Sequence, residues 1–387
     1  MLSVILIAAD EERLLAMQGL VRGSGRTRML RSYNRYPDSP STIRLVRAVN
    51  PEVVILDYQQ RAAAAELARQ IYRISPRTAI LAFGAGDRES AEPYTNGVVQ
   101  VFASLPDEAE LDKALQSAVH AASGLVVDNL YSFLPAKGGS GASTLLLAVA
   151  TALAGPLKKR VLVIEADLRS GVLSFVLNQY PVQSIRNLLE YKLPLDEPSF
   201  QRYLTRCSGV DFLFSDRIPL SSRPAWDDYF ALLEFARAHY DFILADLPEV
   251  INDASSELVR RARAVFLVGT QEIPAIKLAH ARVSELRHWR ADPARSAFLV
   301  NRWHRQELAI NQIEALLERP VAWTFPNDYS AVCKAVNKAE PVPFDARLGQ
   351  SALQFARQLS QPGSEIPPDA NANPAFWDNL RQEIALR

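Results

Sequence analysis

The chain has 387 residues, which exceeds the size at which a single hydrophobic core stops growing, so two or more domains are expected. Hydrophobic residues make up 48% of the chain and charged residues 22%, a composition typical of a globular protein and not of a disordered one. The 43 basic and 43 acidic residues cancel, so the net charge does not favour a nucleic-acid-binding protein. The two cysteines have no zinc-site or disulfide spacing, and the N-terminal apolar run is too short to span a membrane, so a cytoplasmic protein is expected.

The first part of the chain alternates apolar runs of strand length with helical patterns, which is typical of a parallel α/β sheet. We expect strands at Val4–Ala8, Val53–Leu56, Ala79–Phe83 and Val98–Phe102, and helices at Glu11–Val21, Ala62–Ile74 and Glu108–Ala121. These elements predict a first domain over residues 1–122.

A second alternating pattern begins after Gly124 and predicts a larger, doubly wound and mainly parallel sheet over residues 125–360. Its expected strands are Leu130–Leu134, Val161–Ile164, Val210–Phe214, Phe242–Leu244, Ala264–Val268, Ala297–Val300 and Val321–Phe325. Its expected helices include Ser143–Ala154, Trp226–His239 and Pro274–Trp289. Residues 361–387 are expected to form a linker and a short C-terminal tail.

A glycine-rich loop follows the strand at 130–134 and leads into the helix at 143–154. Such a loop lets backbone N–H groups surround phosphates at a helix N-terminus, whereas a glycine-rich strand-to-helix turn without a ligand is the simpler alternative. The candidate nucleotide-binding residues of this loop are Lys137, Gly138, Gly139, Ser140, Gly141, Ala142, Ser143 and Thr144. Ser143 is at the position of a magnesium ligand, and Ala142 is at the position where a P-loop usually has lysine.

Lys137 precedes the two adjacent glycines and matches the additional lysine of the deviant phosphate loop in the MinD/ParA superfamily. The chain resembles that superfamily over roughly residues 125–360. In these proteins the lysine reaches the nucleotide of a partner subunit, so the resemblance implies an ATP-binding, Mg²⁺-dependent homodimer in which Lys137 acts in trans.

Four later motifs extend the resemblance. Asp167 matches the second acidic residue of switch I, with Glu165 in place of the usual aspartate, and Asp246 ends an apolar strand as a Walker B aspartate does. These matches imply a catalytic set of Lys137, Asp167 and Asp246, and a metal-binding set of Ser143, Asp167 and Asp246. Asn301, Arg302 and Pro326 match the adenine-binding segments, although Asn301 could also be a plain turn residue.

The alanine at position 142 predicts slow ATP hydrolysis. A charge pair at about 4 Å and an effective dielectric constant near 20 is worth roughly 4 kcal/mol. Its loss from the transition state alone would slow the reaction by around a thousandfold. Backbone donors, Ser143 and Mg²⁺ would remain, so ATP binding is expected to suffer less than catalysis.

The first domain resembles the receiver domain of response regulators, a flavodoxin-like fold. Asp10, Glu11 and Asp57 follow or end strands, and are expected to meet at one sheet edge as a candidate Mg²⁺ and phosphorylation site. The sequence lacks the Ser/Thr and lysine that receivers have after their fourth and fifth strands, so a docking or dimerisation role is favoured over phosphorylation.

A receiver-like domain followed by a MinD-like domain with a Lys-Gly-Gly-Ser-Gly-Ala-Ser loop is the arrangement of the TadZ/CpaE family. This resemblance implies a scaffold that localises and helps assemble a Flp-type pilus, with pilus or secretion proteins as partners. It also implies a location at the inner-membrane face or the cell pole. Two alternatives stay open: a ParA-type DNA- or cargo-partitioning ATPase, and an active response regulator with a nucleotide-binding output domain. Phe376, Trp377, Leu380 and Ile384 could form a one-sided tail helix that contacts a membrane surface or packs on the protein.

Overall fold

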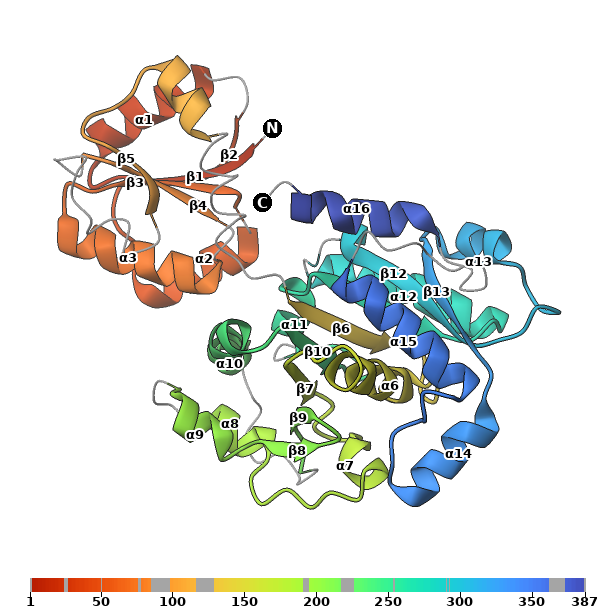
Figure 1. The fold of residues 1–387 in the computed structure, drawn as a ribbon. Coiled ribbons are helices and arrows are strands. Elements are labelled where there is room, and N and C mark those ends of the chain that lie inside the picture. The colour runs from red at the N-terminus through yellow and green to blue at the C-terminus, as the bar shows by residue number, and fades with distance from the viewer. Residues whose placement is uncertain are drawn as a thin grey trace. The chain divides into compact units, whose positions relative to one another are not determined.

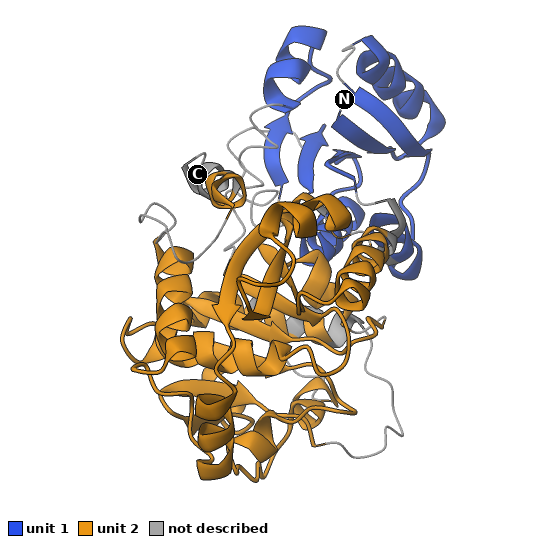
Figure 2. Ribbon diagram, turned by 90° about the vertical axis from the view of Figure 1, so that its right-hand side faces the viewer, with its two compact units in different colours: residues 1–127, 387 blue, residues 128–386 orange. Residues whose placement is uncertain are grey.

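The computed structural model of the chain separates into two compact units, residues 1–127 and residues 128–386 (Figure 2). The structure describes residues 2–23, 27–49, 51–75, 78–84, 98–115, 129–190, 195–216, 226–252, 255–289, 291, 293–361 and 373–385. The expected boundary near Gly124 and most of the expected linker after Ser360 lie outside these residues.

The first unit is built on a five-stranded parallel sheet with the strand order β2-β1-β3-β4-β5 (Figure 1). Its strands are β1 (Leu2–Ile7), β2 (Thr27–Tyr33), β3 (Val53–Asp57), β4 (Ala79–Phe83) and β5 (Val98–Phe102). This order is that of flavodoxin-like doubly wound sheets, in which the direction of winding reverses between the first and third strands.

Helices cover both faces of this sheet because nearly every residue of β1, β3 and β4 is buried. The helices are α1 (Glu11–Gly23), α2 (Ser39–Val49), α3 (Arg61–Ile74) and a helical segment at residues 108–115. Leu14 and Met17 of α1 pack with Leu111 and with every second strand residue on one face, while α2 packs beside α3.

Sequence patterns predicted four of the five strands but missed β2 and α2. β2 is an edge strand in which no residue is fully buried, and it carries Arg28 and Arg31. Charges on an edge strand prevent pairing with other chains, but they also remove the apolar alternation that identifies a strand.

The second unit contains an eight-stranded sheet with the order β13-β12-β11-β6-β10-β7-β9-β8, in which all described pairs are parallel except β8 with β9 (Figure 1). The strands are β6 (Leu130–Pro135), β7 (Val161–Glu165), β8 (Thr205–Cys207), β9 (Val210–Leu213), β10 (Phe242–Asp246), β11 (Ala264–Gly269), β12 (Ser296–Trp303) and β13 (Val321–Pro326). The expected α/β, mainly parallel architecture is therefore confirmed for this unit. Among the strands in the described part of this unit, the sequence patterns missed the short antiparallel strand β8.

Two separate hydrophobic cores lie on the two faces of this sheet. The helices that bury residues in the first core are α6 (Ala142–Ala154), α7 (Leu173–Val176), α14 (Tyr329–Lys338), α15 (Arg347–Ser360) and α16 (Pro374–Ala385). Those that bury residues in the second are α8 (Ile185–Glu190), α9 (Glu197–Gln201), α10 (Trp226–His239), α11 (Ser256–Arg260), α12 (Ile273–His288) and α13 (Ile310–Leu317). Helix α6 is buried on nearly all sides because it lies between the sheet and α15, which explains its almost continuous Ala/Leu sequence.

The C-terminal segment was expected to be a tail outside the second domain, but its helix α16 is part of the first of these two cores. Trp377 is fully buried, and its indole Nε1 donates a hydrogen bond of 3.0 Å to the carbonyl oxygen of Ala322 in β13. Phe376 and Leu380 are buried in the same core. The apolar stripe of α16 therefore packs on the protein in this structure. Within the described residues, the helices are all too short or too polar to cross a membrane.

Replacing Trp377 with alanine should destabilise the second unit by about 3–5 kcal/mol, because the change empties a fully buried indole site. Chemical denaturation of the full chain would measure this effect. Tyr329→Ala is the matched control, since the Tyr329 side chain is 75% exposed. A loss of stability no larger than that of the control would show that α16 does not pack as described.

Candidate functional site

The glycine-rich loop leaves β6, the central strand of the second sheet, and leads directly into α6. Gly139 and Gly141 have positive φ angles of 76° and 87°, which amino acids with a Cβ rarely adopt. Gly141 is the N-cap of α6, so the first N–H groups of the helix point out of its N-terminus without intrahelical partners. The loop therefore has the backbone geometry of an anion site.

Asn301, in β12, holds this loop from the side. Its amide nitrogen donates a hydrogen bond of 2.8 Å to the carbonyl oxygen of Ser140. A Cβ on Gly141 would overlap the same amide nitrogen, so the position requires glycine for a second reason besides its φ angle. Arg302 also contacts the loop, through a bond of 3.3 Å from its guanidinium to the carbonyl oxygen of Gly139.

Pro326 ends β13 and is aligned with Trp303 of β12, one residue after Arg302. The structure thus brings Asn301, Arg302 and Pro326 to the same end of neighbouring strands, close to the glycine-rich loop. This grouping is compatible with the predicted adenine-binding role, and in this structure the Asn301 amide supports the loop.

Lys137 forms an ion pair of 2.8 Å with Glu272, the N-cap of α12. Both side chains are partly exposed, at 35% and 56%, and the hydrogen bond from Lys137 lowers the pKa of the Glu272 carboxyl. A partly exposed pair of this kind is worth about 1 kcal/mol or less. Lys137 is therefore held within its own chain by a contact that can be released at little cost.

Asp246 lies at the end of β10, directly beside β6, with its carboxyl 3% exposed. Burial raises its pKa to about 7; a hydrogen bond from Ser143 acts in the opposite direction, and the negative charges of Glu165 and Asp167 add to the rise. Three carboxylates thus repel one another beside the glycine-rich loop. A cation bound there would relieve this repulsion.

Glu165 has a structural role that its sequence position did not reveal. The side chain is fully buried, and its carboxylate accepts hydrogen bonds from the backbone N–H of Leu173 at 2.7 Å and from Ser215 N and Oγ at 2.8 and 2.9 Å. It therefore ties the segment after β7 to the segment after β9. Sequence reasoning had no signal for Ser215, because the contact spans fifty residues of chain.

Asp167 lies two residues beyond β7 and is half-buried. One of its carboxylate oxygens accepts hydrogen bonds from the backbone N–H groups of Arg169 and Ser170, at 3.1 and 2.8 Å, which fold the following turn. Asp167 is half-buried whereas Glu165 is fully buried, so Asp167 is the acidic residue of this segment that a ligand can reach.

These residues fit a phosphate-bearing ligand with a divalent cation. The hydroxyl of Ser140 is buried and, within the described part of the chain, has no hydrogen-bond partner. No three His, Cys, Asp or Glu side chains among the described residues are grouped to hold a metal by themselves. Mg²⁺, however, commonly binds through one or two carboxylates together with phosphate oxygens, and Ser143, Asp167 and Asp246 are the side chains that would hold it there.

Comparisons with known proteins agree with this geometry. The septum site-determining protein MinD of Synechocystis sp. is 27% identical over 247 residues, which cover 60% of this chain and 88% of that protein. A ParA family ATPase from Chlorobium tepidum has a TM-score of 0.55 at 17% identity, covering 60% of this chain and 98% of the other. MinD from Aquifex aeolicus has a TM-score of 0.52 at 24% identity, covering 62% and 99%. The second unit has the MinD/ParA fold. No protein-family model matches the sequence.

The similarity supports the expected MinD/ParA superfamily. In the second unit the glycine-rich loop from Lys137 to Gly141 lies between β6 and α6, and Ala142, Ser143 and Thr144 form the first turn of α6. The sequence patterns did not predict the ion pair between Lys137 and Glu272. Its only signal is an acidic residue immediately before the Ile273-Pro274 helix start, and such residues are common at helix N-termini.

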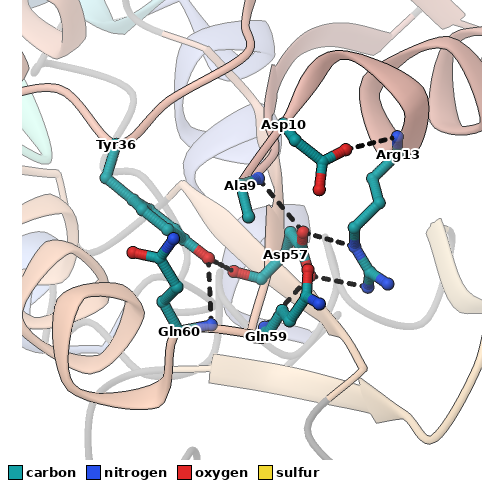
Figure 3. Close-up of polar contacts among 7 residues, drawn as sticks. All are labelled: Ala9, Asp10, Arg13, Tyr36, Asp57, Gln59 and Gln60. Atoms are coloured by element: carbon teal, nitrogen blue, oxygen red, sulfur yellow. Dashed lines mark hydrogen bonds and ion pairs between the residues drawn. The ribbon is translucent and has the colours of Figure 1, made fainter.

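The candidate acidic site of the first unit differs from the expected cluster (Figure 3). Asp57 is fully buried and forms a two-pronged ion pair with Arg13, while Asp10 accepts a hydrogen bond of 2.9 Å from the backbone N–H of Arg13. Glu11 is exposed in the first turn of α1. The described residues therefore contain no cluster of the three carboxylates able to hold a metal. Arg13 occupies the place that a cation was expected to take.

The buried carboxylate of Asp246 can be tested through the pH dependence of protein stability, because folding raises its pKa from 3.8 to about 7. Between these values the folded protein holds a proton that the unfolded chain has released, so the free energy of unfolding falls as pH rises through this window. The full effect is on the order of 4 kcal/mol at most. Asp246→Asn removes the buried charge. The variant should gain stability relative to the wild type between pH 5 and pH 8.

Denaturant titrations of both proteins without nucleotide or divalent cation would measure this difference. Asp345→Asn, which changes an exposed carboxylate, is the control and should show no such gain. A stability difference between Asp246→Asn and the wild type that is the same at both pH values would contradict the raised pKa.

Proposed function

We propose that this protein is an ATP-binding, weakly hydrolysing scaffold of the TadZ/CpaE type, which dimerises and helps to localise and assemble a Flp-type pilus. The observation that carries the proposal is the glycine-rich loop with Ala142 in place of the usual lysine and Lys137 ahead of the glycines. A MinD/ParA fold supports the nucleotide part of the proposal. The flavodoxin-like strand order of the first unit supports a receiver-like domain in front of it.

In this proposal the loop and the first turn of α6 bind the phosphates through backbone N–H groups. Ser143, Asp167 and Asp246 hold Mg²⁺, which would neutralise phosphate charge when bound and would lower the raised pKa of Asp246. Asn301, Arg302 and Pro326 contact the adenine side of the nucleotide. Lys137 leaves Glu272 and reaches the nucleotide of the second subunit, so that dimerisation depends on ATP.

Weak hydrolysis follows from Ala142. This residue is 5% exposed and starts α6, and its methyl group packs against the core. It therefore supplies no positive charge to the phosphates, whereas the usual P-loop lysine would. The loop backbone remains in place without that charge. Such a site would retain bound ATP for long periods, which suits a scaffold better than a rapid motor.

The DNA-partitioning alternative receives no support from charge, because the chain is neutral overall. Several arginines of α11 and α12 are instead paired within the protein. Arg260 and Arg261 contact the buried Glu257, and Arg282 contacts Glu249 and Glu285.

Calorimetric titration of the full chain with Mg-ATP is the first test, and we expect binding by the wild type with barely measurable turnover. Lys137→Ala should keep nucleotide binding by the monomer but lose ATP-dependent dimerisation, as measured by sedimentation. Lys113→Ala, which changes an exposed lysine of the first unit, is the control and should dimerise normally. Ala142→Lys should raise hydrolysis by up to about a thousandfold. Absence of Mg-ATP binding by the wild type, or rapid hydrolysis by it, would refute this part of the proposal.

The pilus role is tested in a bacterium that carries this gene and a Flp-type pilus. Deletion of the gene should abolish surface pili seen by electron microscopy, and a plasmid copy should restore them, with the empty plasmid as control. A fluorescent fusion should form foci at the cell pole. Normal piliation in the deletion strain would show that the scaffold serves another assembly.

A further inference from the structure

Asp57 of the first unit lies where a doubly wound sheet normally binds ligands. In the order β2-β1-β3-β4-β5 the winding reverses between β1 and β3, and ligands of open α/β sheets bind outside the carboxyl ends of the strands at this reversal. Asp57 is the last residue of β3, and Ala9 and Asp10 follow β1. The position therefore predicts a ligand contact for the Asp57 carboxylate.

In this structure, groups of the protein itself fill every acceptor position of that carboxylate (Figure 3). Oδ2 accepts hydrogen bonds from Arg13 Nε at 2.6 Å and from the backbone N–H of Ala9 at 3.1 Å. Oδ1 accepts from Arg13 Nη2 at 2.7 Å and from the backbone N–H of Gln59 at 3.0 Å. A carboxylate has about four lone-pair sites, so four donors leave none for a metal ion or for attack on phosphorus.

The surroundings of Arg13 fit its guanidinium group. Asp10 caps the first turn of α1 by accepting from the backbone N–H of Arg13, which places the Arg13 side chain over the crevice. Gly84, directly after β4, leaves room for it, because a Cβ there would lie 2.7 Å from Arg13 Nη2. On the other side, the Tyr36 hydroxyl donates a bond of 2.8 Å to the carbonyl oxygen of Asp57. Besides α1, the segment after β2, the end of β3 and the residue after β4 therefore define this guanidinium site.

We propose that Arg13 is the resident cation of this crevice and replaces a divalent metal ion. The guanidinium binds the Asp57 carboxylate in two places and closes it to both Mg²⁺ and phosphorylation. Unlike a metal ion, it cannot dissociate from the chain. Removing Arg13 should uncover a divalent-cation site formed by Asp57 and Asp10. The inference deepens the docking role proposed for the first unit and does not depend on nucleotide binding by the second.

The test is a Mn²⁺ titration of the full chain without nucleotide, followed by electron paramagnetic resonance. Arg13→Ala should bind one more Mn²⁺ ion than the wild type, and Arg13→Ala combined with Asp57→Asn should lose that ion again. Any Mn²⁺ bound by the second unit is the same in all three proteins, so it does not affect the difference between them. Glu12→Gln, an exposed carboxylate in the same helical turn, is the control and should bind as the wild type does. A folded Arg13→Ala protein that gains no Mn²⁺ would overturn the proposal.

Loss of Arg13 leaves the buried Asp57 charge without its partner, so Arg13→Ala could unfold the first unit. Gly84→Asn is the second variant, because asparagine tolerates the φ of +70° at this position better than other residues with a Cβ and its side chain crowds Nη2 away from Asp57. It should gain part of the Mn²⁺ binding, and a folded Gly84→Asn protein without any gain would also count against the proposal.

A measurement on the wild type keeps the test independent of folding. Acetyl phosphate would phosphorylate Asp57 by forming a bond between an Asp57 oxygen and phosphorus while acetate leaves. We expect no phosphoryl group on Asp57 in the wild type, as seen by mass spectrometry of its peptides with Mg²⁺ present. Phosphorylated Asp57 would overturn the proposal, whereas failure of Mg-ATP to bind the second unit would leave it untouched.

Discussion

The candidate sites of this protein depend on one property of parallel sheets, which is that the carboxyl ends of all strands lie at the same edge. Polar groups that follow neighbouring strands meet there, beside the N-termini of the helices that come next. Asp57 of the first sheet and Asp246 of the second are both last residues of such strands. Both lie next to a strand that leads into a helix start, and both carboxylates are nearly or fully buried. Each unit therefore faces the same physical problem of stabilising a buried negative charge.

The structure shows three different solutions to this problem. Asp57 is neutralised by a guanidinium and two backbone donors, so its charge is permanently satisfied. Glu165 is stabilised by hydrogen bonds from Leu173 and Ser215 and holds two loops together. Asp246 receives a hydrogen bond from the hydroxyl of Ser143, but burial still raises its pKa to about 7. Asp246 is therefore the carboxylate that a bound cation would stabilise most.

Most of the elements could be predicted from apolar patterns, because strands buried on both faces are continuous runs of Val, Ile, Leu, Ala and Phe. The helix Trp226–His239 and the strands from β6 to β13 follow these patterns closely, apart from β8. The pattern fails at the sheet edges, because β2 and β8 have no fully buried residue. Edge strands carry charged side chains in place of a regular apolar alternation, so their sequences do not identify them as strands. Helix α16 showed the opposite difficulty. Its apolar stripe was visible, but a stripe does not say which surface will cover it.

The candidate nucleotide site was predictable because a phosphate loop is made of backbone from consecutive residues, so its glycines, Lys137 and Ser143 stand together in the sequence. The partners that hold these residues are contributed by distant segments. Lys137 and Glu272 are separated by 135 positions, Ser140 and Asn301 by 161, and Arg13 and Asp57 by 44. The two α/β units, the loop and the deviation at Ala142 can be read from the sequence, since each depends on local order and spacing. The partner of each buried carboxylate follows from the three-dimensional fold alone, because those energies depend on distances between segments that no local pattern contains.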